Sequence, residues 1–324
     1  MPKTSLYAKV SVVVATKDRP DDLRTMLRSM ADQSHRPDQV VIVDSSAKPV
    51  RSVAEEFGGL NVKYIHVDRP SASGQRNTGI RAVDEGMDLI AFLDDDAVLE
   101  AGSLEAMLDF WRAAPVDMGG AAFNWLNHTG PSAAWLKRSR LVRWSGLYSD
   151  RPGLVMPSGW QTITANVPET LEVEWLLSGA SVWRRKVLEK YQFDEFFDGY
   201  SYLEDLDFSY SVGREYRLAV VANAGFRHDP SPSARASSYH FGKVEARNRL
   251  YFVRKHGLSV GRCYLGLLVR LLITTGSALL RLSRGGLARA GGNLAAIARD
   301  MVALGGKSRP QPTGTTPRRR SSPP

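Results

Sequence analysis

Apolar runs of strand length alternate with amphipathic segments through the N-terminal third of the chain. The apolar runs, which are rich in Val and Ile, lie at residues 9–15, 39–43, 61–67 and 88–93. In the first segment between them, apolar side chains recur at i, i+3, i+4 and i+7 from Leu23 to Met30, the spacing of a buried helical face. Further helices are predicted over residues 50–57 and 73–83. Strands that alternate with helices favour an α/β fold with a mostly parallel sheet and right-handed crossovers.

The pattern becomes mixed after the fourth predicted strand. One helix is predicted from Ser103 to Arg112 and another from Phe241 to His256. Further strands are predicted over residues 119–126, 172–177, 181–183 and 218–222. Residues 128–170 are rich in Trp, Pro, Gly and Ser without clear periodicity, and we interpret them as a long functional excursion over an acceptor site.

The C-terminal region is apolar but carries arginines. The stretch from Tyr264 to Leu282 contains Arg270, and its longest uncharged run, residues 271–280, has ten residues. A transmembrane helix needs about twenty, so we expect instead an interfacial helix on anionic lipid. A helix packed on the rest of the chain, or on a second copy in a homo-oligomer, is the alternative.

Three regions are predicted, and the charge is distributed unevenly among them. Residues 1–235 form an α/β domain, residues 236–304 a helical extension at a membrane surface, and residues 305–324 a disordered basic tail. Of the net charge of +9, the segment from Arg262 onward supplies +10, with eleven Lys and Arg and one acid, Asp300. The remaining chain is close to neutral, which argues against a nucleic-acid partner and favours an anionic surface for the basic end.

Cysteine content and the N-terminus indicate a compartment. Cys263 is the single cysteine, which excludes an internal disulfide framework or a thiolate metal cluster within this sequence. The first nine residues lack an apolar core of signal-peptide length. We therefore expect a cytoplasmic protein at the inner face of the cell membrane.

Candidate chemistry gathers at the predicted strand ends. Asp94, Asp95 and Asp96 follow a buried strand, where adjacent carboxylates are costly unless a cation or hydrogen-bond donors compensate them. A divalent metal on a diphosphate would do so, since hard cations bind both kinds of oxygen; a solvated acidic turn is the alternative. Thr16 and Asp44 also end predicted strands, so these groups are expected to converge on one crevice.

Two common nucleotide-binding motifs are missing from the chain. No pair of glycines has the Gly-x-Gly spacing of the dinucleotide fingerprint. Gly74 and Gly79 have the spacing of a P-loop, but Ile80 and Arg81 stand where Lys and Ser or Thr are required. A dehydrogenase or a P-loop phosphotransferase is therefore disfavoured.

Seven short motifs occur together in a familiar order. They are VVVATKDRP (12–20), VIVDSS (41–46), GQRNTG (74–79), FLDDD (92–96), LSGA (177–180), EDLDF (204–208) and His228. In this order the chain resembles the family 2 glycosyltransferases over about residues 9–230, and residues 245–251 resemble a helix that follows this domain in rhamnosyltransferase-like members. The resemblance implies the GT-A fold, a Rossmann-like mixed sheet with helices on both faces, here with a C-terminal helical extension.

The resemblance also implies the donor side of a site. Asp96 and His228 would hold Mn2+ or Mg2+. The residues implied for nucleotide-sugar binding are Thr16, Asp18, Arg19, Asp44, Arg76, Asp94 and Asp95. Carboxylates can accept from a uracil or thymine N3–H, and arginine pairs with phosphate. The alternatives are that Asp18 caps the next helix and that Asp44 is a turn residue.

On the acceptor side, the resemblance implies that Asp205 is the general base that takes the acceptor hydroxyl proton. The residues implied for acceptor contact are Trp175, Ser178, Gly179 and Glu204. A core position for Trp175 and a helix-dipole role for the acids are the alternatives. We expect Asp207 to be structural, because it lies between two apolar residues.

Together these patterns predict a metal-dependent, inverting glycosyltransferase. It would move a sugar from a UDP- or dTDP-sugar to a cell-envelope glycan or a lipid-linked saccharide. A nucleotidyltransferase that makes sugar nucleotides is one alternative, although the loop after the first strand lacks the expected Gly-rich basic sequence. A non-catalytic saccharide- or membrane-binding module is the other.

Overall fold

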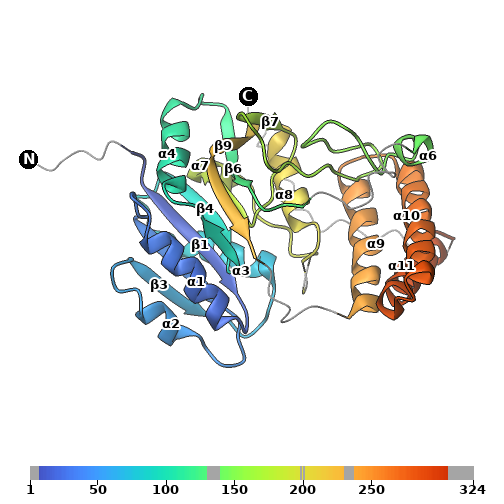
Figure 1. Ribbon diagram of the computed structural model, residues 1–324, viewed down its shortest axis with the longest axis horizontal. Coiled ribbons are helices and arrows are strands. Elements are labelled where there is room, and N and C mark those ends of the chain that lie inside the picture. Colours follow the sequence, from blue (N-terminus) through green and yellow to red (C-terminus); the bar gives the residue numbers. More distant parts are fainter. Residues whose placement is uncertain (1–6, 130–138, 198, 200, 230–236, 306–324) are drawn as a thin grey trace, which may run out of the picture.

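The structure, a computed structural model, describes residues 7–129, 139–197, 199, 201–229 and 237–305 (Figure 1). The strands are β1 (Val10–Thr16), β2 (Gln39–Asp44), β3 (Val62–His66), β4 (Leu89–Asp94), β5 (Ala97–Leu99), β6 (Met118–Trp125), β7 (Leu171–Val173), β8 (Ala180–Arg184) and β9 (Arg217–His228). The helices are α1 (Pro20–Ala31), α2 (Arg51–Glu55), α3 (Ala72–Ala82), α4 (Ser103–Ala113), α6 (Arg140–Trp144), α7 (Arg185–Lys190), α8 (Glu204–Gly213), α9 (Ser238–Lys255), α10 (Val260–Leu280) and α11 (Arg284–Gly305).

One mixed sheet runs in the order β3-β2-β1-β4-β8-β6-β9-β5, and β7 pairs with β9. The β3-β2-β1-β4 half is parallel. β8 is antiparallel to both of its neighbours, whereas β6 and β9 are parallel. Thr16 lies opposite Asp44, and Ala15 lies opposite Asp94, so the carboxyl ends of β1, β2 and β4 are adjacent. The α/β fold expected from the alternating pattern is confirmed.

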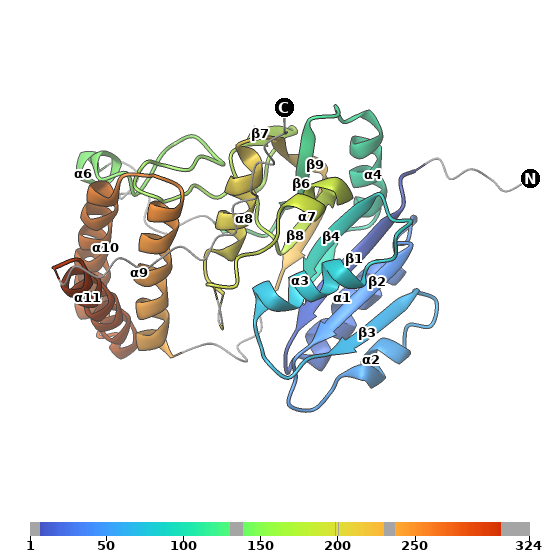
Figure 2. The same ribbon diagram turned by 180° about the vertical axis from the view of Figure 1, so that it is seen from behind.

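Helices cover both faces of this sheet, as Figures 1 and 2 show from opposite sides. α1, α2 and α4 pack on one face, where Met26 and Met107 are fully buried in the same apolar cluster as Val12. α3, α7 and α8 lie on the other face, where the rings of Trp183 and Phe208 meet edge to face at 4.8 Å. Both faces of the central strands are therefore buried, which explains why their sequences are almost continuously apolar.

α9, α10 and α11 form a further layer at the end of the molecule farthest from β3 (Figure 1). A third apolar cluster, which includes Trp160, Trp175 and Leu206, joins these helices to α8 and to the irregular segment before β7. α9 and α11 approach closely at Gly242 and Gly292, where an added Cβ would lie 2.1 Å from a backbone oxygen of the facing helix. Only glycine fits at these two positions, so the pair of helices is held in close register.

A buried ionic network fastens α9 to α8. Asp207 is 1% exposed; its carboxylate accepts from Lys255 Nζ at 2.6 Å and lies 2.8 Å from His256 Nε2. Lys255 also donates to Asp194 at 2.7 Å, and Tyr251 donates to the same carboxylate at 2.8 Å. Asp207 therefore has the structural role that its position between apolar residues suggested.

The structure differs from the sequence-based expectations at several elements. β5, α6 and α7 have no counterpart in the apolar pattern, because each is short, and all three residues of β5 pair with β9. The strand expected over residues 172–177 ends at Val173, since Trp175 turns into the third apolar cluster. The strand expected over 218–222 continues to His228 because β5 and β6 pair with its second half. The tail expected beyond Gly305 lies outside the described residues.

α10 is, among the described helices, long and apolar enough to cross a membrane by its length and composition. In its most apolar 18-residue window, 28% of the residues are buried inside the protein. A core helix of a soluble protein can pass the same test, so the finding alone is weak evidence for a span. Its buried residues, which include Cys263 and Leu267, pack into the third apolar cluster.

The Asp207 network generates a stability prediction. The substitution Asp207→Ala leaves Lys255 and His256 without their buried carboxylate, and we expect it to lower the free energy of unfolding by about 3 kcal/mol. Glu215→Ala is the matched control: it removes a surface ion pair with Lys190 in which both side chains are about half exposed, and we expect a loss under about 1 kcal/mol. Urea unfolding of both variants checks this, and equal losses would contradict it.

Candidate active site

A cleft of about 910 Å³ opens where the carboxyl ends of β1 and β4 face α9 and α11. Its sheet side is lined by Ala15, Thr16, Lys17, Arg19, Asp94, Asp95, Asp96 and His228. The opposite side is lined by Pro70, Ser71, Ala72, Gln75, Arg76, Gly199, Glu204, Ser238, His240, Phe241 and Arg289. Of the strand-end groups expected to converge, Thr16 and the three aspartates share this cleft, whereas Asp44 does not line it.

The three consecutive aspartates turn in different directions and have different partners. Asp94 accepts from Arg76 at 2.8 Å. Asp95 accepts from the Thr16 hydroxyl at 2.8 Å and from Arg19 at 3.0 Å. Asp96 accepts from Arg19 at 3.1 Å. Thr16 and Arg19 thus hold the end of β1 against the turn that follows β4.

Strand pairing brings His228 to this cluster from a distant part of the sequence. β5 follows the aspartates directly, and Ala97 lies opposite His228 in the antiparallel β5–β9 pair. His228 Nε2 is consequently 2.9 Å from Asp96 Oδ1. Asp94, Asp96 and His228 each offer one ligand atom, and these atoms lie within 4.8 Å of one another. Two carboxylates and one imidazole suit Mn2+ or Mg2+, so this donor set fits the expected metal.

Burial and pairing set the protonation of these groups in opposite ways. Burial raises the pKa of Asp95 to about 7, despite the opposing effects of Arg19 and Thr16. Burial also acts on Asp96, but the hydrogen bond and charge of His228, together with Arg19, outweigh it and lower the pKa of Asp96. Asp96 is therefore the more readily ionised of these two carboxyls, and Asp95 holds the end of β1 through Thr16 and Arg19.

Arg76 of α3 joins the aspartates to a second pair of acids. Its guanidinium donates to Asp94 at 2.8 Å and to Glu204, at the start of α8, at 2.9 Å. Asp205 follows Glu204, and burial raises the pKa of both carboxyls. For Glu204 the next cause is the charge of Asp205, so the two acids oppose each other's ionisation. A buried pair of carboxyls with raised pKa values is a candidate for acid–base chemistry.

The backbone before α8 holds these two acids in place. Ser201 and Leu203 have positive φ values of 45° and 77°, which is uncommon for residues other than glycine. Ser201 donates to the Phe197 carbonyl at 2.7 Å, and Asn248 of α9 donates to the Tyr202 carbonyl at 2.7 Å. α9 therefore stabilises the loop that presents Glu204 and Asp205.

Several residues expected at the donor site have other partners. Asp44 is fully buried and accepts from the backbone of Ser46 and Val50 and from the Tyr64 hydroxyl, as a turn residue does. Asp18 accepts from the Ala47 backbone and pairs with Lys17. Neither is among the residues that line the cleft, because these contacts hold both carboxylates against the loop that follows β2. Their assignment as nucleotide contacts therefore stays a prediction.

Of the four residues expected at the acceptor, Glu204 lines the cleft, whereas Trp175, Ser178 and Gly179 do not. Trp175 is 4% exposed and donates to the Thr162 carbonyl, so it belongs to the core. Ser178 is fully buried. Gly179 packs behind the aspartates: an added Cβ would lie 2.4 Å from Asp94 Oδ2. Asp205 directly follows Glu204, which lines the cleft, and Asp205 is itself partly exposed, so it stays the candidate base.

Sequence reasoning missed residues that do line the cleft. Gln75 donates to the Thr16 and Val43 carbonyls at 3.0 and 2.8 Å and so ties α3 to two strand ends. The sequence did contain a signal for Gln75, because this residue lies one position before Arg76 in the motif GQRNTG (74–79). The guanidinium carbon of Arg289, in α11, lies 4.5 Å from the centre of the Phe241 ring, in α9. Neither residue belongs to a motif that could have indicated its place in the cleft.

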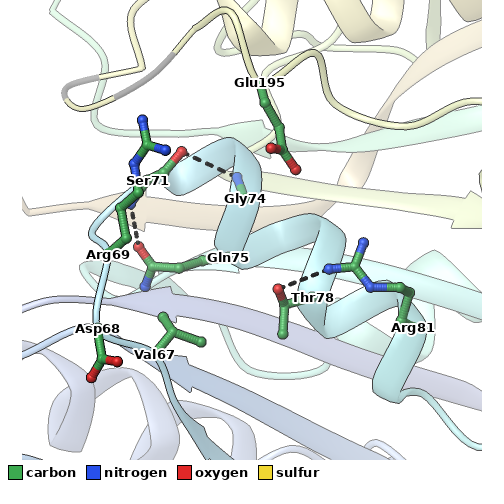
Figure 3. Close-up of a pocket in the computed structure, with 9 residues that line it drawn as sticks. All are labelled: Val67, Asp68, Arg69, Ser71, Gly74, Gln75, Thr78, Arg81 and Glu195. Carbon is green, nitrogen blue, oxygen red and sulfur yellow. Dashed lines mark hydrogen bonds between the residues drawn. The ribbon is translucent and has the colours of Figure 1, made fainter.

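A smaller hollow of about 380 Å³ lies beside the cleft along the outer side of α3 (Figure 3). Its polar groups are engaged with one another: Ser71 accepts from the Gly74 backbone, and Arg81 donates to Thr78 (Figure 3). The aspartate cluster does not line it. The larger cleft is therefore the candidate active site.

Comparisons with known proteins indicate which family and which fold the chain resembles. Residues 11–165 match the family model described as Glycosyl transferase family 2. The minor teichoic acid biosynthesis protein GgaA of Bacillus subtilis (strain 168) is 26% identical over 108 residues, which make up 31% of this chain and 24% of that protein. The matches span less than two fifths of the length of the curated relatives.

Two solved structures show a similar fold over most of the chain. S. aureus TarS 1-349 in complex with UDP-GlcNAc has a TM-score of 0.51 and 17% identity, and the likeness covers 80% of this chain and 70% of that one. The mannosyltransferase PcManGT from Pyrobaculum calidifontis, in complex with GDP-Man and Mn2+, has a TM-score of 0.53 and 14% identity over 94% of this chain and 89% of that one. The expected GT-A architecture is thus confirmed; identities this low show the fold alone.

The donor set generates a prediction for metal binding. We expect Asp96→Asn to weaken Mn2+ binding by more than about a hundredfold, the upper range for loss of a group that merely supports a ligand. Asp229→Asn removes a neighbouring exposed carboxylate outside the donor set and serves as the control, with unchanged affinity. Calorimetric titration of folded protein with Mn2+ measures both, and equal affinities for the two variants would rule out this metal site.

Proposed function

We propose, because residues 11–165 match the model of glycosyl transferase family 2, that this protein moves a sugar from a nucleoside diphosphate sugar to a hydroxyl group of an acceptor, with inversion at the sugar carbon. The observation that carries the proposal is the bridge made by Arg76. Its guanidinium contacts Asp94, beside the candidate metal ligands, and Glu204, beside the candidate base. One buried side chain thereby sets the relative position of the donor and acceptor halves of the cleft.

The donor half suits a diphosphate. Arg76, Arg19 and Lys17 line the cleft with the aspartates, and arginine forms geometrically specific pairs with phosphate oxygens. Asp94, Asp96 and His228 would hold the divalent metal. When bound, that metal offsets charge on the departing diphosphate as a Lewis acid. Arg76 is already fixed by two carboxylates, so it is positioned before the donor binds.

The acceptor half suits proton removal. Asp205 would accept the proton of the acceptor hydroxyl as its oxygen bonds to the sugar carbon, and the bond from that carbon to the diphosphate breaks on the opposite face. Glu204 lies next to it and is paired with Arg76. Phe241 and Arg289 line the same half; an aromatic ring offers an apolar face for a sugar, so these two residues would shape the acceptor site.

The donor and acceptor classes are proposed from the chemistry of the cleft and from similarity to known proteins. A UDP- or dTDP-sugar remains our donor hypothesis, with TarS as a fold relative solved with UDP-GlcNAc. The acceptor would be a cell-envelope glycan or a lipid-linked saccharide, and GgaA, named for teichoic acid biosynthesis, supports an envelope polymer. The protein would then act in the cytoplasm at the inner face of the membrane, where such donors are made.

Donor binding tests the proposal most directly. We expect UDP or dTDP to raise the melting temperature of the folded protein in Mn2+ but not in chelator, and GDP to have a smaller effect. Asp205→Asn should keep this shift while transfer falls by roughly a hundredfold to ten-thousandfold, the usual contribution of a general base. Glu215→Gln, which alters a half-exposed carboxylate just after the end of α8, controls for changes near that helix. A folded sample that binds no nucleoside diphosphate would exclude a transferase and favour a saccharide-binding module.

The raised pKa values generate a prediction for pH dependence. A base acts when ionised, and burial raises the pKa of Asp205 to about 6, well above the ordinary value of an aspartate. We therefore expect the transfer rate to fall as the pH drops through about 6, because Asp205 becomes protonated there. The measurement is kcat/KM against pH at saturating Mn2+. An acidic limb near 3.8 would assign proton removal to an exposed carboxylate instead.

A further inference from the structure

The turn between α10 and α11 presents an unusual group of exposed apolar side chains. We call residues 279–287 the α10–α11 tip. Leu280 and Leu282 are each 89% exposed, Leu279 is 58% exposed and Leu287 is 41% exposed. Among the described residues, nine of the fifteen large apolar side chains with high exposure lie between residues 268 and 302. Such a concentration marks an interaction surface, since isolated exposed leucines are ordinary but clusters are not.

The tip is also cationic. Arg281 and Arg284 are exposed beside the leucines. The sequence contains no acid between Glu245 and Asp300, and both of these acids are already paired, with Arg289 and with Arg254 respectively. The positive charge of the tip is therefore not compensated by its own helices. An apolar and cationic surface complements the interface of an anionic bilayer, where leucines enter the acyl boundary and arginines meet headgroups.

From this arrangement we propose that the α10–α11 tip docks the protein on an anionic lipid bilayer. Docking by the tip fits the structure better than a membrane span by the whole of α10. Arg270, in the middle of α10, lies 3.8 Å from the buried carboxylate of Glu245. Cys263 and Leu267 are packed into the bundle core. A spanning α10 would lose these contacts and place Arg270 in hydrocarbon, whereas the tip is accessible in the folded protein as it stands.

The tip is close to the cleft along the same helix. Arg289, which lines the cleft, follows Arg284 by five residues, a rise of about 7.5 Å in an α-helix. Its bidentate pair with Glu245, at 2.8 and 3.0 Å, and the glycine contacts between α9 and α11 fix that spacing. A protein docked through the tip would hold the acceptor half of its cleft near the bilayer surface. This consequence rests on the proposed function, and it selects lipid-linked saccharides from the two acceptor classes.

Vesicle binding of the full-length chain tests the proposal. The probes are vesicles of phosphatidylcholine alone and of phosphatidylcholine with phosphatidylglycerol, separated by sedimentation at low and high ionic strength. We expect binding to the anionic vesicles that weakens with salt. Arg281→Ser with Arg284→Ser should reduce the partition coefficient by about fivefold for each arginine at low salt. Leu280→Glu with Leu282→Glu should reduce it by about tenfold or more, because the apolar contact is lost.

The controls separate docking from misfolding and from other surfaces. Val116→Glu alters a side chain that is 78% exposed on the loop between α4 and β6, far from the tip in sequence, and should leave vesicle binding unchanged. The leucine variant should keep the wild-type melting temperature, because both positions are solvated, and the wild-type shift with UDP and Mn2+. If the nucleotide shift is missing in every variant and in the wild type, the proposed function fails while vesicle binding still decides the docking surface.

Three outcomes would overturn the proposal. Equal vesicle binding by the wild type and the leucine variant would show that another segment, such as the basic tail, makes the contact. Binding that survives alkaline carbonate extraction would indicate a spanning α10. A wild-type dimer in light scattering that the leucine variant abolishes, with no vesicle binding by either, would assign the tip to a second copy of the chain.

Discussion

The site depends on the burial of several carboxylates at one edge of the sheet. Like charges removed from water repel, and only nearby cations make such a group tolerable. Arg76 supplies one compensation by bridging Asp94 and Glu204, and Arg19 supplies another by contacting Asp95 and Asp96. Removing a partner from such a cluster leaves an uncompensated buried charge, so these ion pairs specify geometry more than they add stability. The directions of the aspartates, and hence the metal donor set, follow from these two arginines.

The C-terminal helices extend the α/β domain and also contribute residues to the site. Asn248 holds the loop before α8, and Lys255 reaches Asp207 within that helix. α9 and α11 then place Phe241 and Arg289 at the mouth of the cleft. The family match ends at residue 165, so these helices, like Glu204, Asp205 and His228, lie in a portion of the chain that the match leaves out.

The same helices couple the site to its surroundings. Glycine contacts make α9 and α11 a close pair, and the buried Glu245 draws Arg270 and Arg289 toward it from two different helices. The α10–α11 tip, at one end of these packed helices, is therefore held in a fixed position relative to the cleft. If the tip meets a bilayer, the orientation of the cleft follows from packing within the protein, without a flexible linker.

The sequence by itself determined the alternating strands and helices and the position of Asp94–Asp96 at a strand end, because apolar periodicity and strand length are local properties. It also indicated Arg76 and the acids at residues 204 and 205 through short motifs. Tertiary structure decided which candidates share a cleft. Asp44 and Trp175 are satisfied by partners in the turn and the core, which local sequence does not reveal. His228 reaches Asp96 through strand pairing across the sheet, and Arg289 reaches the cleft through helix packing. Contacts between residues far apart in the chain depend on the whole fold, so no single motif could have specified them.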